Sequence, residues 1–213
     1  KPTAYRTSKA FASDPGAVAA WLRIGEIKAS EMQCAPFEKS RLTQALPELR
    51  ALTCETDIDL WWPALVDQCR ALGVAVVAEQ EIKGARINGA ARWVAPDKAV
   101  VQLSFRHKRR DIIWFTLFHE LGHLVLHSKK DTFINDDGAH SGVEQQADGF
   151  ASQLLIPRRF EGDLAGLASS NDVREFARQI GIGPDLVVGR LQHDKRWTFK
   201  RGHDLIQQVE VPS

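Results

Sequence analysis

The chain has 213 residues, enough for one substantial domain or for a compact core with a smaller appendage. Its composition, 44% hydrophobic and 26% charged, is that of a globular protein and excludes a disordered or fibrous chain. The 28 basic and 27 acidic residues leave a net charge of +1. This balance gives no indication of a nucleic-acid-binding or membrane-binding surface spread over the whole domain.

Cysteine usage bears on the cellular compartment. The three cysteines are widely spaced and form neither a C-x-x-C pair nor a dense disulfide framework, which favours a reducing setting. There is no signal-peptide pattern and no apolar run long enough to cross a membrane, so we expect a cytoplasmic protein without a membrane partner. The sequence opens on Lys rather than Met, and we expect it to begin inside a longer protein.

Apolar residues at helical spacing predict three helices in the first third of the chain. Pro47 lies inside the second of them and is a potential breaking point. The predicted ranges are 17–33, 38–51 and about 57–73.

The pattern then changes to short β-branched runs, which predict buried strands over 74–78, 91–94 and 99–103. The next long helix is expected to start near Asp111, as its N-cap, and to run to about His127. Helices, a small sheet and then further helices make an α+β domain. The remaining predicted helices, after a loop over 128–142, cover 143–155, about 172–181 and 184–192.

The strongest chemical signal is the motif His119-Glu120-Leu121-Gly122-His123. Residues four apart on a helix differ by about 40° in azimuth and about 6 Å in rise, so the imidazoles of His119 and His123 can reach one ion. Zinc binds imidazole nitrogen readily, and a catalytic zinc site uses three protein ligands plus a water. Glu120 lies off the ligand row, where it can act as the general base toward that water.

The helix that carries this motif is apolar nearly all round and is therefore predicted to be buried. Two histidines and a glutamate inside a buried helix would leave buried polar groups without partners unless something bound them. This context favours a metal site over a chance match on a surface helix.

A third ligand has to come from another element. His127 continues the histidine row, but it lies about 12 Å along the axis from His119, too far for both to bind one ion, so we expect a supporting or structural role for it. Glu144, at the start of the helix over 143–155, is the better candidate and would complete a His₂Glu site. The alternative is that Glu144 is only a first-turn acid favoured by the helix dipole.

The helix over 143–155 carries further features that suit this site. Asp148, one turn beyond Glu144, is expected to orient His119 or His123 through the free ring nitrogen. The small residues Ala147, Gly149 and Ala151 are expected to let the two helices approach closely.

Three segments together carry a family resemblance: 118–124 (FHELGHL), 144–151 (EQQADGFA) and 154–157 (LLIP). They resemble the ImmA/IrrE family of bacterial metallopeptidases. Similarity extends to 21–26, to the strand ending in Leu103-Ser104 and to 187–192. In these parts the chain is similar to a subgroup in which the peptidase follows an N-terminal Xre-type helix-turn-helix, as in HigA-like antitoxins.

The resemblance implies a zincin-like, thermolysin-type core, in which a small mixed sheet packs against the HExxH helix and a second ligand-bearing helix. Carried over by position, the zinc ligands are His119, His123 and Glu144, and the base is Glu120. Many relatives have a second acid two residues beyond the ligand glutamate, where this chain has Gln146. That difference favours Glu144 as the ligand. The His₂Glu set also suits manganese(II) or iron(II).

Known members of the family cleave a helix-turn-helix repressor and so switch on stress-response genes or mobile-element transfer. The resemblance therefore implies a protein or peptide substrate, a repressor or the chain's own fused segment, in stress or toxin–antitoxin regulation. DNA would be contacted only through a helix-turn-helix outside this sequence, and a homodimer is left open. The expected units are an N-terminal helical region packing on the core (1–55), the metallopeptidase domain (56–195) and a C-terminal tail (196–213).

Peptide cleavage also needs a donor for the oxyanion besides the metal. His140 and His193 are candidates, whereas Tyr5, the only tyrosine, is far upstream. For each histidine, an exposed or structural role is the alternative reading.

Two segments near the motif are candidates for substrate contact. The strand over 100–104 is a candidate sheet edge to which a peptide could add, or else an interior strand. The basic run over 106–110 could attract an acidic segment or DNA, or be a solvated loop.

A function of another class remains open on the sequence alone. The domain could be a non-proteolytic sensing module of a DNA-binding regulator or antitoxin, with a metal kept for structure. A fully buried metal with a fourth protein ligand would favour that function. Glu120 argues for catalysis, because a structural site does not need it.

Overall fold

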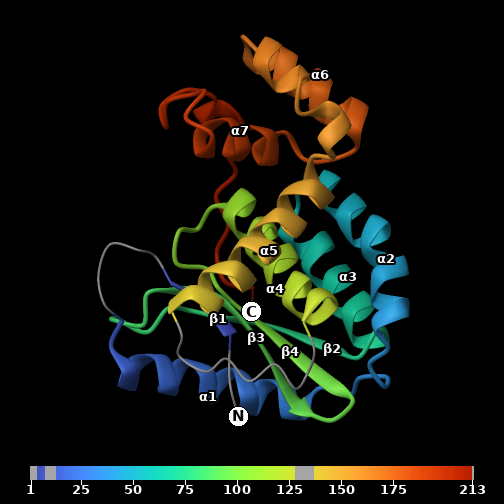
Figure 1. Ribbon diagram of the computed structural model, residues 1–213, viewed down its shortest axis with the longest axis vertical. Helices are drawn as coiled ribbons and strands as arrows, with labels where there is room; N and C mark the ends of the chain where they lie inside the picture. Colours follow the sequence, from blue (N-terminus) through green and yellow to red (C-terminus); the bar gives the residue numbers. More distant parts are fainter. Residues whose placement is uncertain (1–3, 8–12, 128–136, 213) are drawn as a thin grey trace.

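The computed structural model describes residues 4–7, 13–127 and 137–212, with the backbone alone for 4–7 and 137–141. A twisted sheet lies across the molecule, with one helix beneath it and the other helices above it (Figure 1). The strands are β1 (Ala4–Thr7), β2 (Val74–Glu79), β3 (Ile87–Ala95) and β4 (Lys98–Ser104). The helices are α1 (Pro15–Glu31), α2 (Lys39–Ala51), α3 (Ile58–Ala71), α4 (Arg110–Leu126), α5 (Asp137–Leu155), α6 (Ser170–Ile180) and α7 (Pro184–His193). Short 3-10 turns span Leu52–Cys54, Arg158–Phe160, Asp163–Gly166 and His203–Leu205.

The strand order in the sheet is β1-β3-β4-β2. β2 and β4 run parallel, while β3 is antiparallel to both β4 and β1, so the sheet is mixed. The α+β class predicted from the sequence is confirmed. The sequence did not predict β1, and β3 begins at Ile87, four residues before the predicted 91.

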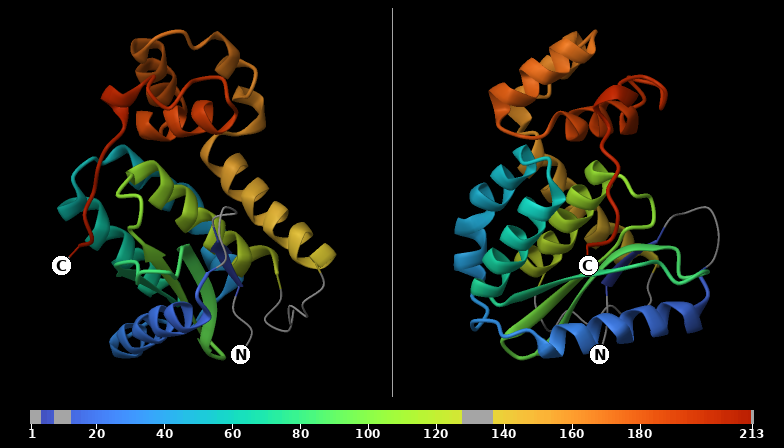
Figure 2. Two further views of the ribbon diagram at one scale, coloured as in Figure 1. Left: turned by 90° about the vertical axis from the view of Figure 1, so that its left-hand side faces the viewer. Right: turned by 180° about the vertical axis from the view of Figure 1, so that it is seen from behind.

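Alternate residues of β2 pack on opposite faces of the sheet. Val74 and Val76 belong to the main core under α3 and α4, whereas Ala75 and Val77 pack against Ala29 of α1. Both faces are therefore buried, which explains why β2 reads as a continuous apolar run instead of an alternating one. Figure 2 shows α1 running along one face and the remaining helices stacked on the other.

The position of β4 decides between the two alternatives given for the strand over 100–104. The strand over 100–104 lies between β3 and β2, so it is an interior strand and not the sheet edge. β1 instead pairs along the outer side of β3, with Arg6 opposite Gly89. Every residue of β4 after Lys98 is buried, as expected for a strand with neighbours on both sides.

Three helix details also differ from the predictions. The N-cap of α4 is Arg109 and not Asp111, whose carboxylate instead accepts two hydrogen bonds from the Arg109 guanidinium at 3.0 and 2.8 Å. Pro47 is exposed and α2 continues through it without a break. α5 begins at Asp137, six residues before the predicted 143.

The basic run over 106–110 is in part the solvated loop given as the alternative, since His107 and Lys108 are exposed, but its lysine and arginines have acidic partners within the fold. Arg106 pairs with Glu81, and Lys108 pairs with Glu210 on the surface. Arg110 is fully buried, where it pairs with Asp185 and donates to the backbone carbonyl of Thr53. Arg110 thus joins α4 to α7 and to the turn at Thr53, while Arg106 and Lys108 tie the segment before α4 to Glu81 and Glu210.

Candidate metal centre

The two histidines of the motif lie on one side of α4, and their rings meet. α4 is buried along almost its whole length, and the exposed fractions of His119 and His123 are 0% and 6%. Their Nε2 atoms are 3.1 Å apart. The spacing of four residues thus brings both imidazoles to one point, as the helical geometry predicts.

Glu144 of α5 completes the cluster. Its Oε2 atom lies 3.2 Å from Nε2 of His119, and its Oε1 atom lies 3.4 Å from Nε2 of His123. Four zinc ligands at 2.0–2.1 Å in a tetrahedron stand roughly 3.3 Å from one another. The three side chains therefore have the spacing that three corners of such a site require, and they form a group that could hold a metal ion.

Glu144 lies about two turns inside α5, because the helix starts at Asp137. A carboxylate that deep in the helix no longer benefits from the positive end of the helix dipole, which acts only on the first turn. Its orientation toward the two imidazoles needs another reason, and the metal-ligand role provides one.

The free ring nitrogens of both histidines are also held. Nδ1 of His119 lies 2.9 Å from Oδ1 of Asp148. Nδ1 of His123 lies 3.2 Å from Nδ1 of His127, whose Nε2 lies 3.0 Å from Oε1 of Gln146. The predicted partner Asp148 thus contacts His119, and His127 supports His123. The link from Gln146 to His127 was missed from the sequence.

The electrostatics of the cluster are those of a site built for a cation. Burial alone lowers the pKa of His119, but hydrogen bonds to Asp148 and Glu144 outweigh it and raise the pKa to about 9. Burial, with the charge on His119 beside it, lowers the pKa of His123 to about 4. Burial opposes ionisation of Glu144, but its hydrogen bond to His119 and the charges on both imidazoles hold its pKa below the usual range. The carboxylates of Glu144 and Asp148 therefore favour positive charge at His119.

Close packing of α4 on α5 brings the ligands together. Gly122, the fourth residue of the motif, faces α5, and a Cβ atom there would lie 2.9 Å from Cδ1 of Phe150. Ala147 and Ala151 are fully buried, in agreement with the predicted close approach. The same prediction for Gly149 is wrong, because a Cβ atom there would have no neighbour within 4 Å.

These two glycines give a matched pair of variants. An alanine in place of either would favour the helix by about 1 kcal/mol. Gly149→Ala is expected to show that gain, whereas Gly122→Ala is expected to lose about 1–3 kcal/mol through overpacking against Phe150. Denaturant unfolding of both variants measures the difference. Equal stabilities would show that the α4–α5 spacing does not depend on Gly122.

The contact between Asp148 and His119 gives a second prediction. Asp148→Asn removes the negative charge at nearly constant shape and is expected to weaken metal binding by about 10- to 100-fold. Competition titration against a chromophoric chelator measures the effect. Asp67→Asn, at an exposed aspartate of α3, is the matched control and is expected to leave affinity unchanged. An unchanged affinity for Asp148→Asn would contradict the orienting role.

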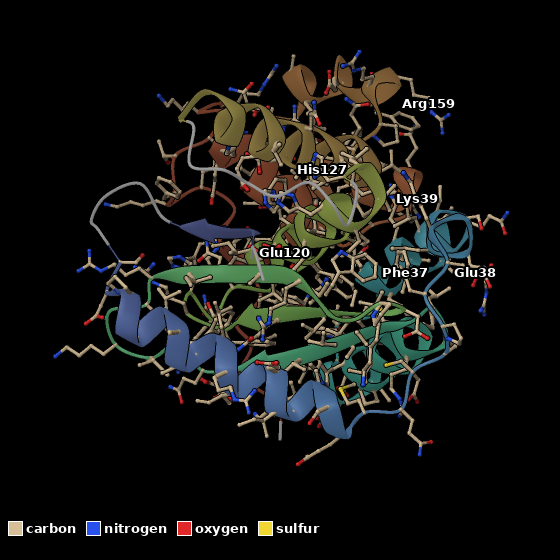
Figure 3. All side chains as sticks on the ribbon, turned by 60° about the horizontal axis from the view of Figure 1, so that its bottom comes forward. Phe37, Glu38, Lys39, Glu120, His127 and Arg159 are labelled. Atoms are coloured by element: carbon tan, nitrogen blue, oxygen red, sulfur yellow. The ribbon has the colours of Figure 1, made fainter. Side chains whose placement is uncertain are left out.

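Glu120 follows His119 directly but turns from the ligand row toward the sheet (Figure 3). It is fully buried, and its side chain packs over Gly89 of β3. A Cβ atom at Gly89 would lie 3.1 Å from Oε1 of Glu120 and 2.5 Å from Cγ2 of Thr116. Glycine at this position therefore lets the strand pass close beneath the carboxylate.

Of the two oxyanion candidates, only His193 has a described side chain. His193 is at the end of α7, where its side chain is 80% exposed and contacts Asp194. It also lines a cavity beside α4. The side chains of His140 and Tyr5 fall outside the described residues, although both lie within described backbone elements. The geometry therefore brings together the ligands and Asp148 but does not select an oxyanion donor.

A comparison with known families agrees with this arrangement. Residues 69–192, more than half of the chain, match the family model Peptidase_M78, described as the IrrE N-terminal-like domain. The chain belongs to the Peptidase_M78 family. This assigns it a peptidase domain of the metallopeptidase type and confirms the resemblance to ImmA/IrrE proteins seen in the sequence. The matched range includes β2 to β4, α4, α5 and the whole metal cluster.

No curated protein shows a significant match to the chain. Among the helices whose placement is described, none is both long and apolar enough to cross a membrane.

Proposed function

We propose that the chain is a metal-dependent endopeptidase with a zincin-like, thermolysin-type core, in which zinc is held by His119, His123 and Glu144. The observation that carries the proposal is the convergence of three ligand atoms at 3.1–3.4 Å, with Glu120 next to the first of them on the same buried helix. Membership of a peptidase family supports the same reaction class.

A metal ion bound there would polarise the scissile carbonyl and lower the pKa of a water molecule toward neutrality. Glu120 acts as the general base that takes the proton of the attacking water and then delivers it to the leaving amine. Packing over Gly89 holds its carboxylate in place. Asp148 and His127 keep the rings of His119 and His123 turned with Nε2 toward Glu144. Fixed side chains of this kind lower the cost of reaching the reactive geometry.

Within the described residues, the ligand cluster has three members and Glu144 is 30% exposed. Three protein ligands with access from solvent are typical of a catalytic site, whereas a structural zinc site is closed by a fourth protein ligand. This supports the peptidase over the alternative of a sensing domain with a structural metal.

The proposed substrate is a helix-turn-helix repressor, in a bacterial stress or toxin–antitoxin system, with a fused helix-turn-helix segment as the link to DNA. The family match and the resemblance of the sequence to repressor-cleaving members support this proposal. The test incubates the purified chain with helix-turn-helix repressors from the same organism and follows their intact mass. Cleavage is expected with zinc, to stop with 1,10-phenanthroline and to return when zinc is added back. Cleavage that continues in the chelator would refute metal-dependent catalysis.

A further inference from the structure

A cavity of about 210 Å³ lies beside the metal centre, between α4, α5, α7 and β3. Apolar side chains form much of its wall: Ile112, Phe115, Leu155, Ile156 and Leu186. The polar groups that reach it come from the sheet, from the loop before α4 and from helices α4, α5 and α7.

The ligands themselves do not line the cavity, but some of its lining residues lie one helical turn from the cluster. Phe115 lies one helical turn, about 6 Å, before His119 on α4. Ser152 lies one turn beyond Asp148 on α5, and Asn88 precedes Gly89, the residue beneath Glu120. When the scissile bond of a bound polypeptide lies at the metal centre, the side chain of the substrate residue next to that bond can therefore reach this cavity.

The charged groups of the cavity wall are neutralised within the chain. Asp111 accepts two hydrogen bonds from Arg109. Arg190 pairs with Asp194 at 2.8 Å and with Glu161 at 3.5 Å. Desolvation lowers the pKa of His107, so this ring favours its neutral form. A charged side chain entering the cavity would lose its water without gaining a free counter-charge, which is unfavourable.

The size of the cavity sets a limit on its occupant. An apolar protein cavity of about 150 Å³ is enough to hold a benzene molecule, whereas drug-sized ligands need about 300–1,000 Å³. A volume of about 210 Å³ suits one large side chain and is too small for a cofactor.

The geometry points to this cavity as the substrate side-chain pocket, which takes a large apolar residue such as Leu or Phe next to the scissile bond. The inference rests on the proposed peptidase function, but the pocket itself can be tested without turnover. Full burial of such a side chain favours binding by about 10- to 150-fold, enough to make that residue a main determinant of where the substrate is cut.

The test is binding of amino-acid amides to the metal-free chain, followed by methyl NMR of Ile112, Ile156 and Leu186. N-acetyl-leucinamide and N-acetyl-phenylalaninamide are expected to shift these resonances. The α-amide of N-acetyl-aspartic acid, which keeps its side-chain carboxylate, is not. Ser152→Leu would fill the cavity and is expected to weaken binding by about tenfold or more. Gln153→Leu, at an exposed neighbour on α5, is the matched control and should bind as the wild type does.

Phe115→Ala provides a second variant, which keeps the inference open to refutation if Ser152→Leu does not fold. It enlarges the cavity and is expected to raise affinity for N-acetyl-tryptophanamide relative to N-acetyl-leucinamide. Equal shifts with the aspartate and leucine amides, or no shifts at all, would overturn the pocket.

A cleavage experiment then separates this inference from the proposed function. The zinc-loaded chain is incubated with a mixture of peptides, and the cut positions are mapped by mass spectrometry. A large apolar residue is expected on one side of most cut bonds, and cuts without such a preference would overturn the pocket. Failure of the wild type to cut any peptide would count against the peptidase, while the amide-binding result would still decide the pocket.

Discussion

Replacement of Glu120 by glutamine is expected to lower kcat for peptide cleavage by about 10²–10⁴-fold, the range that a positioned general base contributes. Glutamine keeps the shape of the side chain, which packs tightly over Gly89, but it cannot take a proton from water. The loss should therefore appear in kcat at nearly constant KM. Quantitative mass spectrometry of cleaved repressor over time measures both.

The control for this variant is its metal content. Glu120 packs over Gly89 and is not one of the three ligands, so Glu120→Gln should hold as much zinc as the wild type. Glu175→Gln, at an exposed glutamate of α6, should leave both metal content and cleavage unchanged. Full cleavage by a folded, zinc-loaded Glu120→Gln would remove Glu120 from the role of base.

The parts of the site that follow from local sequence could be predicted. The helix expected from Asp111 to about His127 is found at Arg110–Leu126, because its dense apolar residues specify a buried helix without reference to any partner. The i, i+4 spacing fixes the meeting of His119 and His123 for the same reason. Glu144 could be chosen because helix periodicity and the ligand preferences of zinc leave few acids in the right place.

The features that were missed depend on contacts between distant segments. β1 is four residues long and its paired residues lie 80 to 87 positions away, so no local pattern predicts it. β4 lies inside the sheet because β2 pairs with the side that β3 leaves open, and this parallel pairing also could not be read from the residues of β4 alone.

Two further details depend on how α5 sits against α4. The first residues of α5 are rich in glycine and polar residues, which locally favour a loop, yet the helix extends back to Asp137. The contact of Gln146 with His127 depends on the rotation of one helix against the other. Its only signal in the sequence was the unusual glutamine two residues after the ligand glutamate.

Replacement of Glu144 by alanine is expected to weaken zinc binding by more than about 100-fold, a larger loss than removal of a supporting group such as Asp148. Among the side chains that the structure describes, Glu144 provides the only ligand atom from α5, and without it the two imidazoles of α4 would have to hold the ion with solvent. Elemental analysis after dialysis measures the metal retained per chain, and peptide cleavage should fall with it.

Gln145→Ala is the matched control for this variant, because it truncates the exposed neighbour on the same helix without touching the cluster. It should retain the zinc of the wild type. The comparison also separates the two roles considered for Glu144. A first-turn acid would affect only the stability of α5, whereas a ligand affects zinc affinity directly, and Glu144 lies about two turns past the start of that helix. Zinc held at full occupancy by Glu144→Ala would mean that the ion is bound elsewhere, and the proposed catalytic arrangement would have to be abandoned.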